Sequence, residues 1–170
     1  MKNRSSLYFV SLMLLPTVFA GCYSFKGTSI PPEANTFFVA QFEVIPENIP
    51  PTVGQDFSEL LKIKILRESR LNYRDIDPDL EFSGIITEYK VTAEAPQAGE
   101  TTSFNRLTIA MTVEYTNNNN EKNAWGQARR FSQFFDYPSN QNLIDVQDEL
   151  LENIFTELTE RIFNEAFTNW

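Results

Sequence analysis

The stretch of residues 103–117 alternates apolar and polar side chains through most of its length. Its apolar positions are Leu107, Ile109, Met111, Val113 and Tyr115, and the positions between them are Arg106, Thr108, Ala110, Thr112 and Glu114. Successive side chains of a β-strand point to opposite faces of the sheet, so this period of two predicts a strand with one buried face. A sheet with one apolar face needs a second layer to cover it. The rest of the chain must therefore supply neighbouring strands and a covering layer.

Three further segments have the pattern or the composition of strands. Residues 36–44 carry apolar side chains at every second position, and residues 80–93 and 123–136 are rich in β-branched and aromatic residues. The four asparagines at 117–120 predict a hairpin tip, because asparagine tolerates turn conformations. The last three strands therefore form a predicted antiparallel meander. Gly84, inside one of them, indicates a bulge or a close approach of another group.

Two segments have the periodicity of amphipathic helices. The first begins at a predicted capping box, Thr52-Val53-Gly54-Gln55, and the second spans residues 143–168. The apolar stripes are Phe57, Leu60, Leu61 and Ile65 in the first, and Leu151, Ile154, Phe155, Leu158, Ile162, Phe163, Ala166 and Phe167 in the second. The sequence thus predicts an α+β fold: a two-layer sandwich in which two helices cover one face of a four-stranded mixed sheet, in the order strand, helix, three strands, helix.

The N-terminal segment has the build of a secretory signal peptide, because Lys2 and Arg4 precede an apolar run over residues 7–19 and small residues follow. The run is shorter than the roughly 20 apolar residues that span a bilayer. The closing motif Ala20-Gly21-Cys22 resembles the lipobox of bacterial lipoproteins, although Phe19 stands where most lipoboxes carry an aliphatic residue. The resemblance implies cleavage before the cysteine and a diacylglycerol on its sulfur. The alternative is an ordinary signal peptide with an incidental cysteine.

These features divide the chain into a lipoprotein signal peptide (residues 1–21), a lipidated tether (22–35) and a single α+β domain (36–170). The Pro31-Pro32 pair discourages helix in the tether, which reaches at most about 45 Å at roughly 3.3 Å per residue. We expect the domain to lie close to the membrane that holds its acyl chains, palmitate among them. By resemblance to the enterobacterial sorting rule, Tyr23 in place of Asp favours the outer membrane.

Composition argues against several classes of function. The formal net charge of the chain is −9, and removal of the signal peptide with its two cations brings it to −11. This balance argues against nucleic acid as a partner and leaves the acyl chains as the membrane attachment. The absence of histidine removes the commonest general base and metal ligand, so we expect no enzyme and no metal or cofactor site. A hydrolase built on carboxylates such as Asp75 and Asp77 is the enzymatic alternative, but two acids in a turn carry little information.

Four stretches of the mature chain, residues 22–32, 80–89, 106–115 and 131–137, resemble in their joint order the LptE-type lipopolysaccharide-assembly lipoproteins, in the form found in Bacteroidetes. The resemblance implies a non-enzymatic role. It implies a place inside the lumen of the LptD β-barrel at the outer membrane, where such proteins act as plug and chaperone. It also implies that lipopolysaccharide itself can be bound.

Three arginines are the candidate ligand-binding residues. Arg106 lies in the third predicted strand and Arg129 and Arg130 in the fourth, so they would cluster if these two strands pair. Such a cluster would offer positive charge to a phosphorylated glycolipid that an acidic domain otherwise repels. The alternative is that they are exposed sheet charges that balance nearby carboxylates.

Two functional hypotheses follow from the anchor. The first is an outer-membrane lipoprotein that faces the periplasm, plugs an LptD-like barrel, assists its assembly and contacts lipopolysaccharide. The second is an anchored periplasmic lipoprotein that regulates a cell-wall synthase. Such a regulator usually needs a longer tether to cross the periplasm, and a reach of about 45 Å counts against it. We therefore expect the first.

Overall fold

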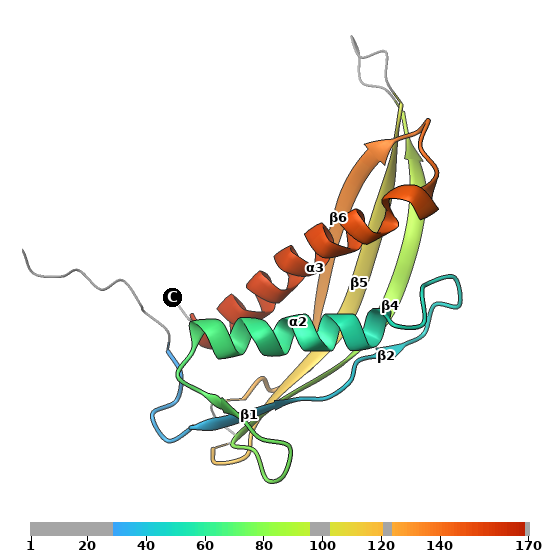
Figure 1. Ribbon diagram of the computed structural model, residues 1–170. Helices are drawn as coiled ribbons and strands as arrows, with labels where there is room; N and C mark the ends of the chain where they lie inside the picture. Colours follow the sequence, from blue (N-terminus) through green and yellow to red (C-terminus); the bar gives the residue numbers. More distant parts are fainter. Residues whose placement is uncertain (1–28, 96–102, 121–123, 169–170) are drawn as a thin grey trace, which may run out of the picture.

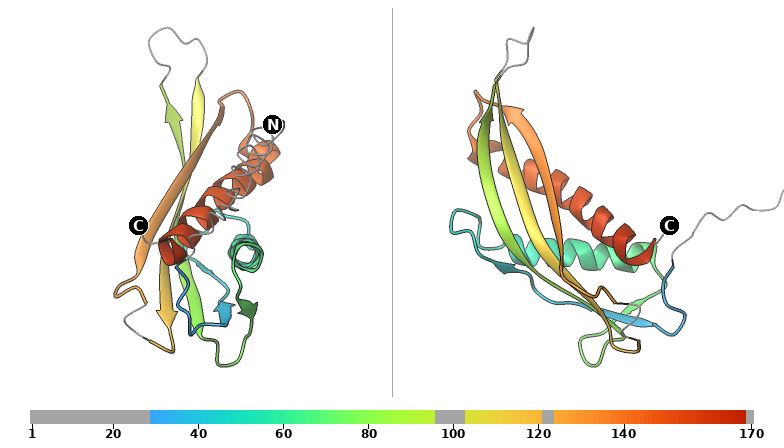
Figure 2. Two further views of the ribbon diagram at one scale, coloured as in Figure 1. Left: turned by 90° about the vertical axis from the view of Figure 1, so that its left-hand side faces the viewer. Right: turned by 180° about the vertical axis from the view of Figure 1, so that it is seen from behind.

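The computed structural model describes residues 29–95, 103–120 and 124–168, which form two layers (Figure 1). One layer is a six-stranded sheet, and the other consists of two helices that lie on the same side of it (Figures 1 and 2). The α+β class and the covering of one face by two helices are confirmed. The elements are β1 (Thr36–Val39), β2 (Glu43–Val44), α2 (Val53–Glu68), β3 (Asn72–Tyr73), β4 (Leu80–Glu94), β5 (Phe104–Asn117), β6 (Arg129–Pro138) and α3 (Leu143–Phe167).

The sheet is mixed, as predicted. Its strand order is β3-β1-β4-β5-β6, and β2 also pairs with β4. The short strands β1 and β2 run parallel to β4, whereas β4, β5 and β6 form the predicted antiparallel meander. In the meander Phe82 lies opposite Tyr115, and Met111 lies opposite Phe131. The alternation seen in residues 103–117 therefore places one apolar row against the helices.

The prediction of four strands is wrong, and the first predicted strand shows why. Residues 36–44 pair with β4 at both ends but leave the ladder between β1 and β2. At the interruption the backbone N–H of Phe42 donates instead to the hydroxyl of Ser58 on α2 (2.9 Å), and that hydroxyl donates to the carbonyl of Gly54 (2.7 Å). This hydrogen bond to a helix distant in the sequence interrupts the strand, and no local sequence pattern predicts the interruption. The sixth strand is β3, a two-residue parallel partner of β1 within a segment predicted to be a turn.

Among the later elements, β6 differs most from its predicted limits, since it begins six residues later and ends two residues later, at Pro138. The limits of β4, β5 and α3 lie within one residue of the predicted ones, but β6 begins at Arg129 rather than at residue 123. Ahead of it, Trp125 packs on Tyr115 and Phe131, and its N–H donates to the Tyr115 carbonyl (3.0 Å). Thr52 is the N-cap of α2, but its side chain makes no capping hydrogen bond, so the predicted capping box does not form.

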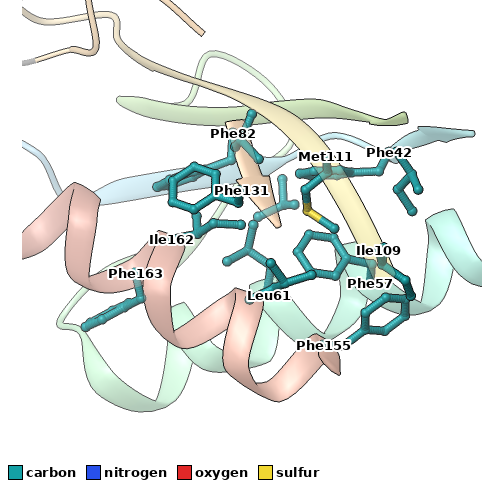
Figure 3. Packing of buried hydrophobic residues seen from close by; sticks show 14 of the residues in the cluster. Phe42, Phe57, Leu61, Phe82, Ile109, Met111, Phe131, Phe155, Ile162 and Phe163 are labelled. Carbon is teal, nitrogen blue, oxygen red and sulfur yellow. The ribbon is translucent and has the colours of Figure 1, made fainter. Parts of the chain in front are cut away.

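A row of aromatic rings holds the two layers together (Figure 3). Phe57 of α2 stands edge-on to Phe42 (centroids 4.8 Å apart) and to Phe155 of α3 (5.2 Å), so it contacts the sheet layer and the second helix at once. Phe82 of β4 packs at a tilt against Tyr115 of β5 and stands edge-on to Phe167 of α3. Burial of these side chains supplies much of the driving force for folding.

Gly84 is the site of a close approach. A Cβ atom at this position would lie 2.4 Å from the Phe42 ring and 2.7 Å from the carbonyl oxygen of Thr112. Only glycine leaves room for the Phe42 ring to sit on β4 at this point. The predicted close approach is confirmed, whereas the bulge lies a few residues further on, between Ile86 and Glu88.

The Asp79 carboxylate ties β1 to the start of β4. Its Oδ2 accepts hydrogen bonds from the backbone N–H groups of Asn35 (2.8 Å) and Thr36 (2.9 Å) and from the Thr36 hydroxyl (2.8 Å). Its Oδ1 accepts one from the Asn119 amide (2.8 Å), at the end of β5. These donors stabilise the charged form and lower the pKa of Asp79 from 3.8 to about 2, with the Asn35 N–H as the largest cause.

We expect Asp79 to make the stability of the domain depend on acid pH. Because the pKa is lower in the folded protein, its contribution is full above the unfolded value of 3.8 and is lost as the pH falls towards about 2. Asp79→Asn should therefore cost about 1 kcal/mol at neutral pH, discounted for partial exposure, and much less near pH 2. Urea unfolding of both proteins at several pH values measures the difference. A gap that stays constant down to pH 2 would contradict the prediction.

Candidate functional site

The three candidate arginines lie on two paired strands but do not form one cluster. Arg106 is opposite Asp136, and Arg130 is opposite Thr112, six residues further along β5. At about 3.4 Å per residue this separates Arg106 from the other two by about 20 Å. The predicted pairing of the two strands is present, and the register of that pairing keeps the arginines apart.

Arg106 is held by acids and by an aromatic ring. Its Nε and an Nη donate to the two carboxylate oxygens of Asp136 at 2.7 and 2.8 Å, and Glu94 lies 3.7 Å away. Its guanidinium also lies over the Phe134 ring, 3.9 Å from the centroid. The bidentate hydrogen bonds from Arg106 lower the pKa of the Asp136 carboxyl. This arrangement fixes Arg106 on the side of the sheet away from the helices.

Arg129 and Arg130 are neighbours in the chain but point to opposite sides of the sheet. Arg130 donates to Glu88 of β4 (2.8 Å), and its side chain is 59% exposed. Arg129 forms an ion pair with Glu165 of α3 and lies over the Trp125 ring, 4.9 Å from its centroid. Each candidate arginine thus has an acidic partner. Sequence reasoning did not identify these acids, because strand register and helix docking decide which partners 30 or more positions apart will meet.

The sheet face away from the helices, here called the outer face, carries no covering element in the described part of the chain (right view of Figure 2). Polar and charged side chains dominate it, with a few apolar ones among them. The register places on it Ser83, Ile85, Glu88, Lys90 and Thr92 of β4, Arg106, Thr108, Thr112 and Glu114 of β5, and Arg130, Ser132, Phe134 and Asp136 of β6.

A second feature lies on the helix side, at the C-terminal part of α3. A groove of about 490 Å³ runs between the helix and β6, and its lining includes Phe131, Arg161, Glu165 and Thr168. Arg161 donates to the backbone carbonyl of Ser132 (2.7 Å) at the edge of β6. The groove therefore brings one aromatic side chain together with a cation and an acid. Sequence reasoning did not identify it.

The described residues hold no group of three or more histidine, cysteine, aspartate or glutamate side chains placed to bind a metal ion. None of their helices is long and apolar enough to cross a membrane. Cys22 and the signal peptide lie outside the described residues, so their assignment remains a prediction. The candidate functional features among the described residues are therefore the outer face of the sheet and the groove beside α3.

The described domain has two layers, one uncovered sheet face and a groove beside its last helix. The family model of LptE, described as lipopolysaccharide-assembly, matches residues 34–166. The chain therefore belongs to the LptE family of lipopolysaccharide-assembly proteins, a family of non-enzymatic assembly lipoproteins. The resemblance noted in the sequence is confirmed.

Two solved structures resemble this chain at low sequence identity. A minor lipoprotein from Acinetobacter baumannii is 11% identical, covers 78% of this chain and 91% of its own, and has a TM-score of 0.50. The hypothetical protein CT253 from Chlamydia trachomatis is 10% identical over 80% of this chain and 99% of its own, with a TM-score of 0.49. No curated protein sequence matches the chain.

Proposed function

We propose that this protein is an outer-membrane lipoprotein that plugs an LptD-like β-barrel and assists its assembly during transport of lipopolysaccharide to the cell surface. The observation that carries the proposal is the LptE match over residues 34–166, which spans nearly the whole described domain. The lipobox-like motif at Cys22 and the short tether behind it support a domain held near the membrane face.

The two surfaces suit a protein enclosed by a partner. The outer face is largely polar, and its arginines are already paired with carboxylates, so contact with a polar barrel wall buries few unbalanced charges. The helices cover the apolar face of the sheet with aromatic side chains. Because its hydrophobic core is formed within the domain, such a domain can stay folded both inside and outside the barrel, as an assembly factor must.

We also propose Arg106, Arg129 and Arg130 as contacts for the phosphate groups of lipopolysaccharide. Each would exchange its carboxylate partner for a phosphate, which guanidinium groups bind in the same bidentate geometry. Arg130, with its side chain 59% exposed, is the one most open to such an exchange. Their separation means that they would act on different parts of the ligand.

Purification of the tagged lipoprotein from gently solubilised outer membranes tests the main proposal. We expect one large β-barrel protein to copurify in near-equal amount, and depletion of the lipoprotein to block export of lipopolysaccharide. A loss of peptidoglycan incorporation with normal lipopolysaccharide export would favour the regulator of a cell-wall synthase instead. Absence of a barrel partner, under conditions that preserve other barrel complexes, would rule the proposal out.

A further inference from the structure

We propose that two copies of this domain associate through β6, which pairs antiparallel with β6 of the second copy. β6 lies at the end of the strand order, and within the described residues no strand pairs with its second edge. The left view of Figure 2 looks onto this edge, and α3 runs beside it rather than across it. A ten-residue exposed edge is a template for the addition of another strand.

The backbone groups that face this edge can be assigned from the register. The Ser139 N–H donates to the carbonyl of Ser103 (3.0 Å), and hydrogen-bonded pairs alternate along an antiparallel ladder. Odd-numbered residues of β6 therefore bond to β5. Pro138, which has no N–H, and Ser132, whose carbonyl is reached by Arg161, both fit this alternation. The residues that turn their N–H and C=O groups to the free edge are Arg130, Ser132, Phe134 and Asp136.

Two adjacent phenylalanines on β6 are partly exposed in the single copy, although the Arg106 guanidinium lies over the Phe134 ring. Phe134 is 45% exposed on the outer face, and Phe135 is 40% exposed on the helix side of the sheet. The groove of about 490 Å³ between α3 and β6 opens on that same helix side, with Phe131 in its lining. The strand thus carries an exposed aromatic side chain, Phe135, and borders a groove whose lining includes Phe131.

Antiparallel pairing centred on Gln133 joins these complementary features. In this register Arg130 lies opposite Asp136 of the second copy, and the reverse pair forms by symmetry, so opposite charges meet at two places. Each pair would form by sharing or exchanging the partners of the single copy, which are Glu88 for Arg130 and Arg106 for Asp136. Phe135 lies opposite Phe131 of the second copy and enters the groove beside it. Registers centred on Ser132 or Phe134 do not bring these charges opposite each other.

The same register provides hydrogen-bond partners for the backbone groups near the centre of the pairing. Ser132 pairs with Phe134 of the second copy, whose N–H donates to the Ser132 carbonyl in place of Arg161. In the single copy the Ser132 carbonyl thus accepts a hydrogen bond from Arg161, and in the pair it accepts one from the second copy instead. An antiparallel β6 from a second copy supplies both an opposite charge for Arg130 and Asp136 and an aromatic side chain, Phe135, for the groove. The occupant that fits this edge is therefore a second copy of the chain. This inference goes beyond the proposed function and does not depend on it.

Cysteine cross-linking of the full chain in its own membrane tests the pairing and the register. Gln133→Cys places two thiols across the symmetry axis, with Cα atoms about 4.5 Å apart, which is within the range for a disulfide. With copper–phenanthroline as oxidant, we expect a dimer band on a non-reducing gel several-fold stronger than for Ser132→Cys or Phe134→Cys. The unmodified chain and Lys90→Cys, exposed on β4, set the background. A signal at that background, or a maximum at 132 or 134, would overturn the pairing or its register.

A second pair of variants tests the groove. Phe135→Glu in the Gln133→Cys chain should lower cross-linking about tenfold or more, because a charge replaces the aromatic ring in the groove. Val91→Glu is the matched control, since Val91 is also 40% exposed and lies on β4, away from the edge; it should leave the band unchanged. Equal bands from both variants would show that Phe135 does not enter the groove. A cross-link to a different protein in place of the dimer would show that another strand occupies the edge.

Discussion

Replacing Phe57 by alanine is expected to lower the free energy of unfolding by about 3–5 kcal/mol. Phe57 is fully buried and stands edge-on to Phe42 on the sheet side and to Phe155 on α3. Its removal therefore leaves a cavity where three elements meet, and the surrounding rings cannot close it without moving a helix. A loss of this size is a large part of the stability of a typical domain.

Equilibrium unfolding in urea measures this loss, and Leu66→Ala on the same helix is the matched control. Leu66 is 43% exposed, so its truncation should change stability by no more than about 0.5 kcal/mol. Both residues are apolar and lie on α2, but Phe57 is buried in the core whereas Leu66 is exposed. If the two variants unfolded at the same urea concentration, the aromatic row would not be what joins the layers.

The sequence predicted best the limits of those elements that pack one apolar face against a single opposing layer. β5 and α3 each present a continuous apolar face to a single opposing layer, so their periodicity is undisturbed and their limits lie within a residue of the predicted ones. The interruption between β1 and β2 depends instead on Ser58, 16 positions away on a helix. The short strand β3 depends on β1, which it meets only after α2 has folded back. Such features have no local signal.

The same reasoning separates what could be predicted of the candidate site. Arginine is recognisable in a sequence, and the three candidates were identified together with the strands that carry them. Their partners Asp136, Glu88 and Glu165 were not, because a register of pairing and the docking of α3 decide which acid each arginine meets. The groove beside Phe131 was missed for the same reason, since it exists only between two elements.

The free edge of β6 and the bare outer face have different consequences for a protein of this family. An edge can be covered by strand pairing, which uses backbone groups and depends little on the partner's sequence. A polar face needs a partner of matching charge and shape, which makes it the more selective surface. The dimer through β6 leaves the outer face of both copies uncovered. Pairing of two copies would therefore cover the edge before the domain meets a barrel. Arg130 belongs to both surfaces, whereas Phe135 on the helix side belongs only to the edge contact, so Phe135→Glu separates the two.

Loss of the anchor is expected to have the largest effect on where the protein is found. Cys22→Ser should abolish incorporation of labelled acyl chains, and a chain whose signal peptide is cleaved ahead of Tyr23 should carry no lipid at all. Two acyl chains hold a protein firmly, at about 0.8 kcal/mol per buried CH₂, whereas one chain binds only marginally. A mature domain with a charge near −11 gains nothing from an anionic membrane surface in their place.

The proposed barrel partner is a second attachment, and the experiment must separate the two. In cells with the barrel, we expect the anchorless chain to be retained in the membrane fraction only in proportion to the barrel present. In cells depleted of the barrel, it should move from the membrane fraction almost completely to the soluble periplasmic fraction, while the native lipoprotein stays in the membrane. Acyl labelling of Cys22→Ser would show that the cysteine is not the lipidated residue. If the chain without Cys22 stayed in the membrane fraction of barrel-depleted cells, neither the lipid nor the barrel would explain its membrane association, because both attachments are absent in that experiment.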